Sequence, residues 1–203
     1  MDNERIILGS GYVHVTEFSG QLPTVEEICK EETLFSYIQG GASIEYKPTT
    51  YTARDDMGKV SKVITTAEEA TLKSGLMTFC GKTLAALVDT ARVEEIAAEG
   101  NTPGKRIVKV GGIGNQNRKR YVICFHHVDD VDGDIYVMIV GRNEAGFTLA
   151  FAKDKETVVD AEFKAQPHDA EGTLIYYEEV IPVEEGTEEP EDPGETTPKK
   201  QYI

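Results

Sequence analysis

Residues 141–179 read GRNEAGFTLAFAKDKETVVDAEFKAQPHDAEGTLIYYEE. Apolar side chains alternate with polar ones along this stretch, which is the pattern of half-buried β-strands. The alternating positions are Phe147, Leu149 and Phe151, and then Val159, Ala161 and Phe163. With turns rich in Asn, Asp, Gly and Pro, the stretch predicts three successive strands and contains no plausible catalytic cluster. Regular strands that end in an open edge favour a protein that assembles with copies of itself.

The length of 203 residues suits one domain with a proper core, plus arms or a tail. No segment approaches the roughly 20 apolar residues that span a bilayer. The first residues, MDNERIILGSGYVH, lack the basic region and apolar core of a signal peptide. We therefore expect synthesis and folding in a cytoplasm, with no membrane insertion.

Charge and cysteine content exclude further classes. The net charge of −15 argues against a protein that binds nucleic acid tightly. It is compatible with a protein that nucleic acid passes without being bound. The cysteines, Cys29, Cys80 and Cys124, are scattered and odd in number. This distribution disfavours a disulfide framework or a C-x-x-C metal site and predicts buried or half-buried thiols.

The chain divides into three parts. Residues 1–20 are short apolar pieces broken by glycines, as in an arm or first strand, and residues 21–183 form the β-rich domain. From Glu184 the chain holds seven acids and two lysines, so this tail carries −5 of the charge and the body −10. The tail predicts a flexible, solvated terminus, or else an arm that orders on a neighbouring subunit.

Local patterns predict the elements of the domain. Thr24 is expected to cap a short helix with Glu26 and Glu27 in its first turn, and Gly40 and Gly41 to end the segment after it. Residues 42–66 read as a long hairpin around the turn DDMG. A further strand should then place the side chains of Ala70, Leu72, Ser74 and Leu76 on one face.

The clearest helix is predicted at 82–90, with Gly81 before it. Residues 92–100 could continue this helix or begin a strand, and NTPG at 101–104 is a turn in either case. Strands return within 105–112, 118–128 and 133–143. The fold class is therefore mainly β (α+β): two packed antiparallel sheets forming a sandwich or partial barrel, with one flanking α-helix.

Candidate chemistry is sparse. His126 and His127 precede DDVDGD, but adjacent strand residues point to opposite faces, and Asp132-Gly133 is a turn dipeptide. GGIGN at 111–115 and GKT at 81–83 lack the spacing of nucleotide-binding loops. The basic run at 118–120 favours an ion pair between subunits over a phosphate contact. We expect no enzyme activity, no catalytic residue, no cofactor and no metal site.

Several segments, in order, carry a family resemblance. They are GGASIEYKP, DDMGKVSKVITTAEEATLKSGLMTF, KTLAALVDTARVE, KVGG, RYVICFHHVD and the block GFTLAFAKDKETVVDAEFKAQPHDAEGTLIYYEE. Over about residues 5–180 this series resembles the tail tube (major tail) proteins of tailed bacteriophages. None of these segments is an active-site motif, so the resemblance rests on their order and extent.

The resemblance implies two packed β-sheets with a flanking helix, in subunits that form hexameric rings. Rings stack into a tube around a channel that conducts genomic DNA, without specific binding, from the virion to the host cell. The implied partners are other copies of the chain, a tape-measure protein, and tail terminator or baseplate proteins. The implied location is the virion tail, assembled in the host cytoplasm. The acidic tail shows no sign of the extra immunoglobulin-like domain that some relatives carry.

Physical arguments agree with a ring. Paired edge strands remove the aggregation hazard of an open sheet, and closed head-to-tail contacts generate rings. An acidic channel wall would provide no favourable binding site for the phosphates of DNA. For inter-ring stacking the expected segment is residues 44–60. Its candidate contact residues are Tyr46, Thr49, Thr50, Tyr51, Thr52, Asp55 and Asp56.

Three alternatives stay open at this point. The chain could be the tube subunit of a contractile tail or of a phage-derived bacteriocin. It could instead be a monomeric β-sandwich that binds carbohydrate through exposed tyrosines, or a metal-dependent enzyme that uses His126 and His127. The tyrosines considered for the second alternative are Tyr46, Tyr51, Tyr136, Tyr176 and Tyr177.

Overall fold

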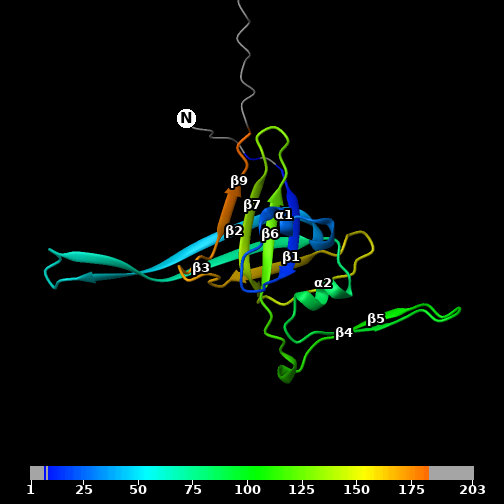
Figure 1. Ribbon diagram of the computed structural model, residues 1–203. Coiled ribbons are helices and arrows are strands. Elements are labelled where there is room, and N and C mark those ends of the chain that lie inside the picture. Colours follow the sequence, from blue (N-terminus) through cyan, green and yellow to red (C-terminus); the bar gives the residue numbers. More distant parts are fainter. Residues whose placement is uncertain (1–6, 8, 183–203) are drawn as a thin grey trace, which may run out of the picture.

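A computed structural model describes residues 7 and 9–182, and strands dominate it (Figure 1). The predicted acidic tail from Glu184 lies outside the described residues. The strands are β1 (Gly11–Glu17), β2 (Leu34–Arg54), β3 (Ser61–Leu76), β4 (Arg92–Ile96), β5 (Lys105–Lys109), β6 (Tyr121–His127), β7 (Ile135–Asn143), β8 (Val159–Ala165) and β9 (Tyr176–Glu179). The helical segments are short: α1 (Val25–Ile28), α2 (Gly81–Ala86), and the 3-10 turns η1 (Glu31–Thr33) and η2 (Ile113–Asn115).

Seven strands form one antiparallel sheet in the order β6-β1-β2-β3-β8-β7-β9. Because β6 also pairs with β7, from Tyr121↔Gly141 to His127↔Ile135, the sheet curls into a near-ring. Strands β4 and β5 make a separate small sheet. The predicted mainly β fold, a sandwich or partial barrel with flanking helix, is therefore confirmed, with a single curled sheet supplying both layers.

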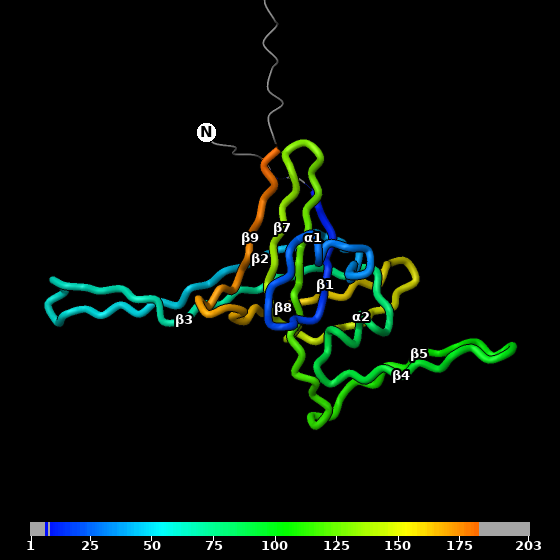
Figure 2. Tube along the Cα trace, in the orientation of Figure 1, coloured from blue at the N-terminus to red at the C-terminus, as the bar shows by residue number. Residues whose placement is uncertain are grey.

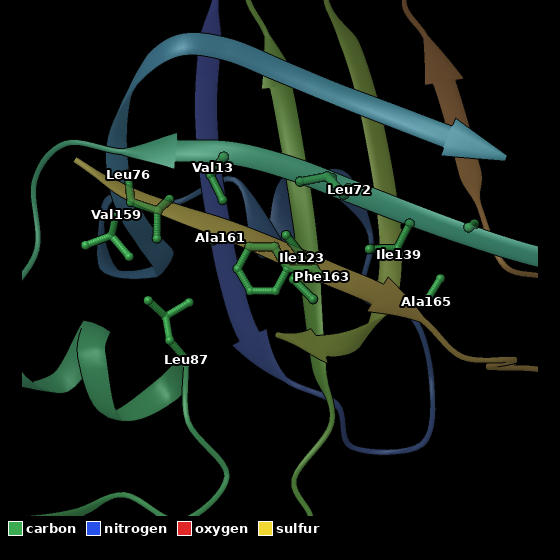
Figure 3. Close-up of a cluster of buried hydrophobic side chains, with 11 residues drawn as sticks. Val13, Leu72, Leu76, Leu87, Ile123, Ile139, Val159, Ala161, Phe163 and Ala165 are labelled. Carbon is green, nitrogen blue, oxygen red and sulfur yellow. The ribbon is translucent and has the colours of Figure 1, made fainter. Parts of the chain in front are cut away.

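The interior of the near-ring is the main core (Figure 3). Alternation along the strands turns every second side chain inward, as the predicted series Val159, Ala161 and Phe163 shows by being at most 2% exposed. Leu87, which follows α2, closes one end of this core. The buried members are Val13, Ala70, Leu72, Leu76, Leu87, Ile123, Ile139, Val159, Ala161, Phe163 and Ala165.

A second apolar layer lies on the outer face of β6 and β7, where α1 covers it. The helix contributes Val25 and Ile28, and the strands contribute Val122, Cys124, Met138 and Val140. The predicted start of α1 is confirmed, because the Thr24 backbone N–H donates to Glu27 Oε2 at 3.0 Å. This layer fixes the segment that contains Cys29 against the outside of the near-ring.

The predicted strand at Phe147–Phe151 is wrong, because the chain is irregular from 144 to 158. Asn143 ends β7: its Nδ2 donates to the carbonyl oxygens of Leu87, at 3.1 Å, and Gly146, at 2.6 Å. Its Oδ1 accepts the Glu162 N–H at 2.9 Å, which takes a donor from the β7–β8 ladder. Phe147 and Leu149 still pack on the core, whereas Phe151 is 82% exposed.

Other boundaries also differ from the predictions. Helix α2 ends at Ala86 rather than Thr90, and the ambiguous segment after it forms β4. The predicted face at residues 70–76 is buried as expected, but it belongs to the same strand as the hairpin, β3. Gly40 and Gly41 do not end a segment: with φ of 80° and 78° they form an irregularity inside β2.

Candidate assembly surface

The distal ribbon is the part of the β2–β3 hairpin from residue 45 to residue 69, and every residue in it is exposed. Near the body the two strands have outer neighbours, since β1 pairs with β2 at 34–37 and β8 pairs with β3 at 71–76. Beyond those positions β2 and β3 pair only with each other, as far as Arg54↔Ser61. Figure 2 shows the ribbon projecting from the body.

Apolar side chains lie on both faces of the distal ribbon. Tyr51 pairs with Ile64, and the next pair, Thr52 with Val63, faces the opposite way. Tyr51 is 59% exposed, Ile64 44% and Val63 60%. A two-stranded ribbon is marginal in water, and contiguous exposed apolar groups are typical of interaction surfaces. The ribbon therefore has the composition of a segment that packs against another surface.

All seven sequence-predicted assembly residues lie on this ribbon. Tyr46, Thr49, Thr50, Tyr51 and Thr52 belong to β2, and Asp55 and Asp56 belong to the turn after it. The structure thus brings the candidates together on one projecting element.

Two of these residues also have partners inside the ribbon. Asp55 Oδ1 accepts the Val60 N–H at 2.7 Å, so this side chain shapes the turn. Tyr46 donates its hydroxyl to the Glu68 carboxylate, and this hydrogen bond raises the pKa of Tyr46. Both side chains are therefore held in place before any neighbour binds.

A second hairpin, β4–β5, projects on the other side of the body in the view of Figure 1. Its exposed ion pairs join Arg106 to Glu95 and Lys109 to Glu94, each at 2.8 Å. Exposed pairs of this kind contribute little stability. Val93 and Ile96 on β4 are 41% and 48% exposed. Within the described residues, this hairpin and β9 add further strand edges that pair on one side only.

The basic run at 118–120 makes its contacts within the chain. Lys119 Nζ lies 2.6 Å from Glu17 Oε2, and the Arg120 guanidinium lies 4.7 Å from the centre of the Phe18 ring. The Arg118 backbone N–H donates to Asp89 Oδ1 at 2.8 Å. Side-chain contacts within the chain are thus shown for Lys119 and Arg120, and the ion pair expected between subunits stays a prediction.

His126 and His127 point to opposite faces of β6, as predicted. His127 is buried, and its Nδ1 donates to the Ser10 carbonyl at 2.9 Å. His126 Nε2 lies 2.8 Å from Asp134 Oδ2. Burial would raise the pKa of Asp134, but hydrogen bonds from His126, the Asp129 N–H and Tyr136 lower it. Burial and the Asp134 contact raise the pKa of Tyr136 to about 12.

A row of aromatic rings crosses the outside of four strands at the same level. Tyr37 and Tyr12 meet edge to face at 6.0 Å between centroids, His126 lies 6.3 Å from Tyr12, and Tyr136 stacks on His126 at 4.5 Å. Of the five tyrosines considered for carbohydrate binding, this row includes only Tyr136. Sequence reasoning missed Tyr12 and Tyr37, because their alignment depends on the register between distant strands.

Comparison of the sequence with protein-family models and with curated proteins finds no match. Among the described residues, no helix is long and apolar enough to cross a membrane.

Proposed function

We propose that the protein is a structural subunit that self-assembles into stacked rings, hexameric by family resemblance, and forms the tail tube of a bacteriophage. The observation that carries the proposal is the distal ribbon. It is a projecting two-stranded element with apolar groups on both faces and, within the described residues, no packing partner. The resemblance of the sequence to tail tube proteins gives the partner its identity, a second copy of the chain.

The body of the protein folds around its own core, which leaves contacts between subunits to the projecting elements. Its near-ring pairs β6 with β7, so the strands around the core satisfy one another without help from a neighbour. The block at 141–179 was expected to offer an edge: its strand β8 is flanked by β3 and β7, whereas its last strand, β9, pairs with β7 alone and leaves one edge open. Contacts between subunits then come from the distal ribbon, the β4–β5 hairpin and β9, whose edges remain accessible.

In the proposed assembly the ribbon of one subunit packs on the next ring or on its neighbour in the same ring. A head-to-tail contact of this kind closes into a ring when the rotation permits, and rings then stack. Genomic DNA and a tape-measure protein pass along the channel, and terminator or baseplate proteins close its ends. A contractile tail or a bacteriocin tube uses the same kind of subunit and stays a near alternative.

Negative-stain microscopy with light scattering tests the proposal on the purified full-length chain. We expect rings or hollow tubes that become more abundant as the concentration rises. Persistent monodisperse monomers at high concentration would show that the proposal is wrong.

A variant with a shortened distal ribbon tests whether the ribbon is needed for assembly. Residues 50–66 are replaced by Asn-Gly, a two-residue hairpin turn, between the paired residues Thr49 and Ala67. Because the buried body is untouched, its circular dichroism and urea midpoint should stay near those of the wild type, while tubes are lost. In a milder variant, Tyr51→Thr with Ile64→Thr removes one apolar pair and keeps strand-forming residues, and it should lower the tube yield. Tubes of normal length and yield in both variants would remove the ribbon from the interface.

A carbohydrate-binding module is the second candidate function, and the aromatic row favours it. Tyr12 and Tyr37 are 40% and 50% exposed, so their rings could stack on sugar faces. This function predicts a stable monomer whose binding to a polysaccharide column is lost in Tyr37→Ala. Tubes that form equally well in Tyr37→Ala, without retention of the wild type on the column, would exclude it.

A further inference from the structure

Two histidines and a cysteine from three different segments meet on the outer face of the near-ring. His14 lies on β1, His126 lies on β6, and Cys29 follows α1. One ligand-capable atom from each of the three lies within 4.8 Å of the other two. His14 is 6% exposed, so this cluster is part of the packed layer under α1.

Strand register explains why these residues meet. In the β1–β6 ladder His14 pairs with Cys124, and Tyr12 pairs with His126. Paired residues in an antiparallel ladder share a face, as do residues two apart along a strand. His14, Cys124 and His126 therefore share the outer face, and the end of α1 places Cys29 above them.

In each imidazole one ring nitrogen donates a hydrogen bond to an oxygen, and the other nitrogen keeps a lone pair that can bind a metal ion. The Asp134 carboxylate accepts from His126 Nε2 at 2.8 Å, which leaves a lone pair on Nδ1. Thr33 Oγ1 donates its proton to a backbone carbonyl, that of Ile28 or that of Lys30, so it accepts from His14 Nδ1 at 3.3 Å. His14 Nε2 then carries the lone pair. A carboxylate or hydroxyl behind the ring is the support that metal-bound histidines have in proteins.

The distance between the sulfur atoms of Cys29 and Cys124 is also compatible with a metal site. Cys29 Sγ and Cys124 Sγ are 3.8 Å apart. Two thiolates on a tetrahedral Zn²⁺, with Zn–S bonds of about 2.3 Å, are separated by about 3.8 Å. A disulfide requires about 2.05 Å. The separation equals that of an S–H···S hydrogen bond and also suits two thiolates on one ion, which makes Cys124 a candidate ligand beside the three clustered residues.

We propose that His14, Cys29 and His126 bind a Zn²⁺ ion, with Cys124 as the fourth ligand. Ligand atoms of a tetrahedral zinc site lie about 3.3–3.8 Å apart, so side-chain shifts of about 1 Å would bring His14, Cys29 and His126 to that spacing. Cys124 lies outside this group of three and reaches the ion from its contact with Cys29. Sulfur and imidazole donors select zinc over magnesium or calcium, which prefer oxygen. The ion would link α1 and the loop after it to β1 and β6. This structural role does not depend on the proposal that the protein forms a tube.

The sequence did not predict this site. Because adjacent strand residues point to opposite faces, the sequence disfavoured a site made from His126 and His127, and in the structure His127 points inward. Neither His14 nor Cys29 carries a local motif, because each ligand comes from a different segment. This proposal departs from the expectation of no metal site, and zinc titration of the reduced protein decides between the two.

The test uses the full-length chain, stripped with a chelator under reducing conditions and titrated with Zn²⁺ or Co²⁺ alone. We expect one ion per chain, a higher thermal midpoint with Zn²⁺, and a thiolate-to-cobalt charge-transfer band with the visible spectrum of tetrahedral Co²⁺. Absence of stoichiometric binding by the reduced, folded protein would overturn the proposal. So would conversion of Cys29 and Cys124 to a disulfide in air with no metal uptake after reduction.

Variants locate the ion. Cys29→Ser and His126→Gln should abolish stoichiometric binding, while Cys80→Ser, at an exposed cysteine, should leave it unchanged as the matched control. Asp134→Asn keeps all ligands but weakens the support of His126, so it should reduce zinc affinity about 10- to 100-fold. Circular dichroism of the metal-free variants confirms that each one folds. Equal zinc binding in Cys29→Ser and the wild type would exclude this site.

Discussion

Gly141 stands where the sheet closes on itself. This residue of β7 pairs with Tyr121 of β6 on one side and with Ala165 of β8 on the other. A Cβ atom built on Gly141 would lie 2.0 Å from the Lys164 carbonyl oxygen. Only a residue without a side chain lets the backbones approach this closely at the bend of a curled sheet.

Gly141→Ala should therefore destabilise the protein, by about 1–3 kcal/mol, because the backbone must shift to admit the methyl group. Urea unfolding monitored by circular dichroism measures the change. Gly114→Ala is the matched control, since a Cβ there would meet no heavy atom within 4 Å. Its expected effect is within about 0.5 kcal/mol of zero. Equal stability of the two variants would contradict this role for Gly141.

Asp169 makes the stability of a turn depend on pH. Its Oδ1 accepts the N–H groups of Glu171 at 3.0 Å and Thr173 at 2.9 Å. Hydrogen bonds from Thr173 hold the pKa of Asp169 below its ordinary value of 3.8. A carboxyl group with a lowered pKa in the folded state stabilises the fold above the unfolded pKa. That stabilisation is lost as the pH falls through the folded value.

Asp169→Ala should thus have a lower urea midpoint than the wild type at pH 6, and the difference should shrink between pH 4 and pH 2. Asp169→Asn keeps the oxygen acceptor without the charge, so it should fall between the two at pH 6 and lack this pH dependence. A difference between Asp169→Ala and the wild type that stays constant down to pH 2 would show that the ionised carboxylate has no part in it.

At the scale of the element, the distal ribbon and the strands of the body are stabilised by different interactions. β6 and β7 carry core residues on both faces, among them Ile123, Cys124, Ile139 and Val140, all fully buried. The ribbon has ladder hydrogen bonds but exposed side chains on both faces. Its local opening should therefore cost much less free energy than opening of the body.

Hydrogen exchange measures this difference. In the monomeric subunit we expect the amides of residues 50–65 to exchange rapidly and those of β6 and β7 slowly. If tubes form as proposed, the same ribbon amides should become protected on assembly while β6 and β7 change little. Slow exchange of the ribbon in the monomer would mean that it is stable alone, and unchanged exchange in tubes would place it outside the interface.

At the scale of the whole molecule, a self-contained near-ring carries two projecting hairpins (Figure 2). The core closes internally through the β6–β7 pairing, so the body can fold before any neighbour arrives. The net charge of −15 opposes non-specific association between copies and leaves assembly to specific contacts. If rings form as proposed, folding of the body should precede their assembly.

Local patterns predicted much of the fold. The hairpin around DDMG, the short helix at Thr24, the buried face from Ala70 to Leu76 and the turn at Asp132-Gly133 all follow from alternation, capping and turn chemistry. The candidate assembly residues also came from the sequence, since a long polar hairpin with interspersed tyrosines is visible there. The predicted strand at Phe147–Phe151 failed, because side-chain bonds of Asn143 to distant backbone groups end β7 first.

The sequence by itself determined the β class, most of the strands and the hairpin that became the candidate surface, because period and turn chemistry act over a few residues. Only the tertiary structure decided that the sheet curls into a near-ring, that the ribbon extends beyond its neighbours, and that His14, Cys29 and His126 meet. These features depend on the register between strands far apart in the chain. A shift of one residue would turn each of those side chains to the other face, and no local pattern encodes that choice.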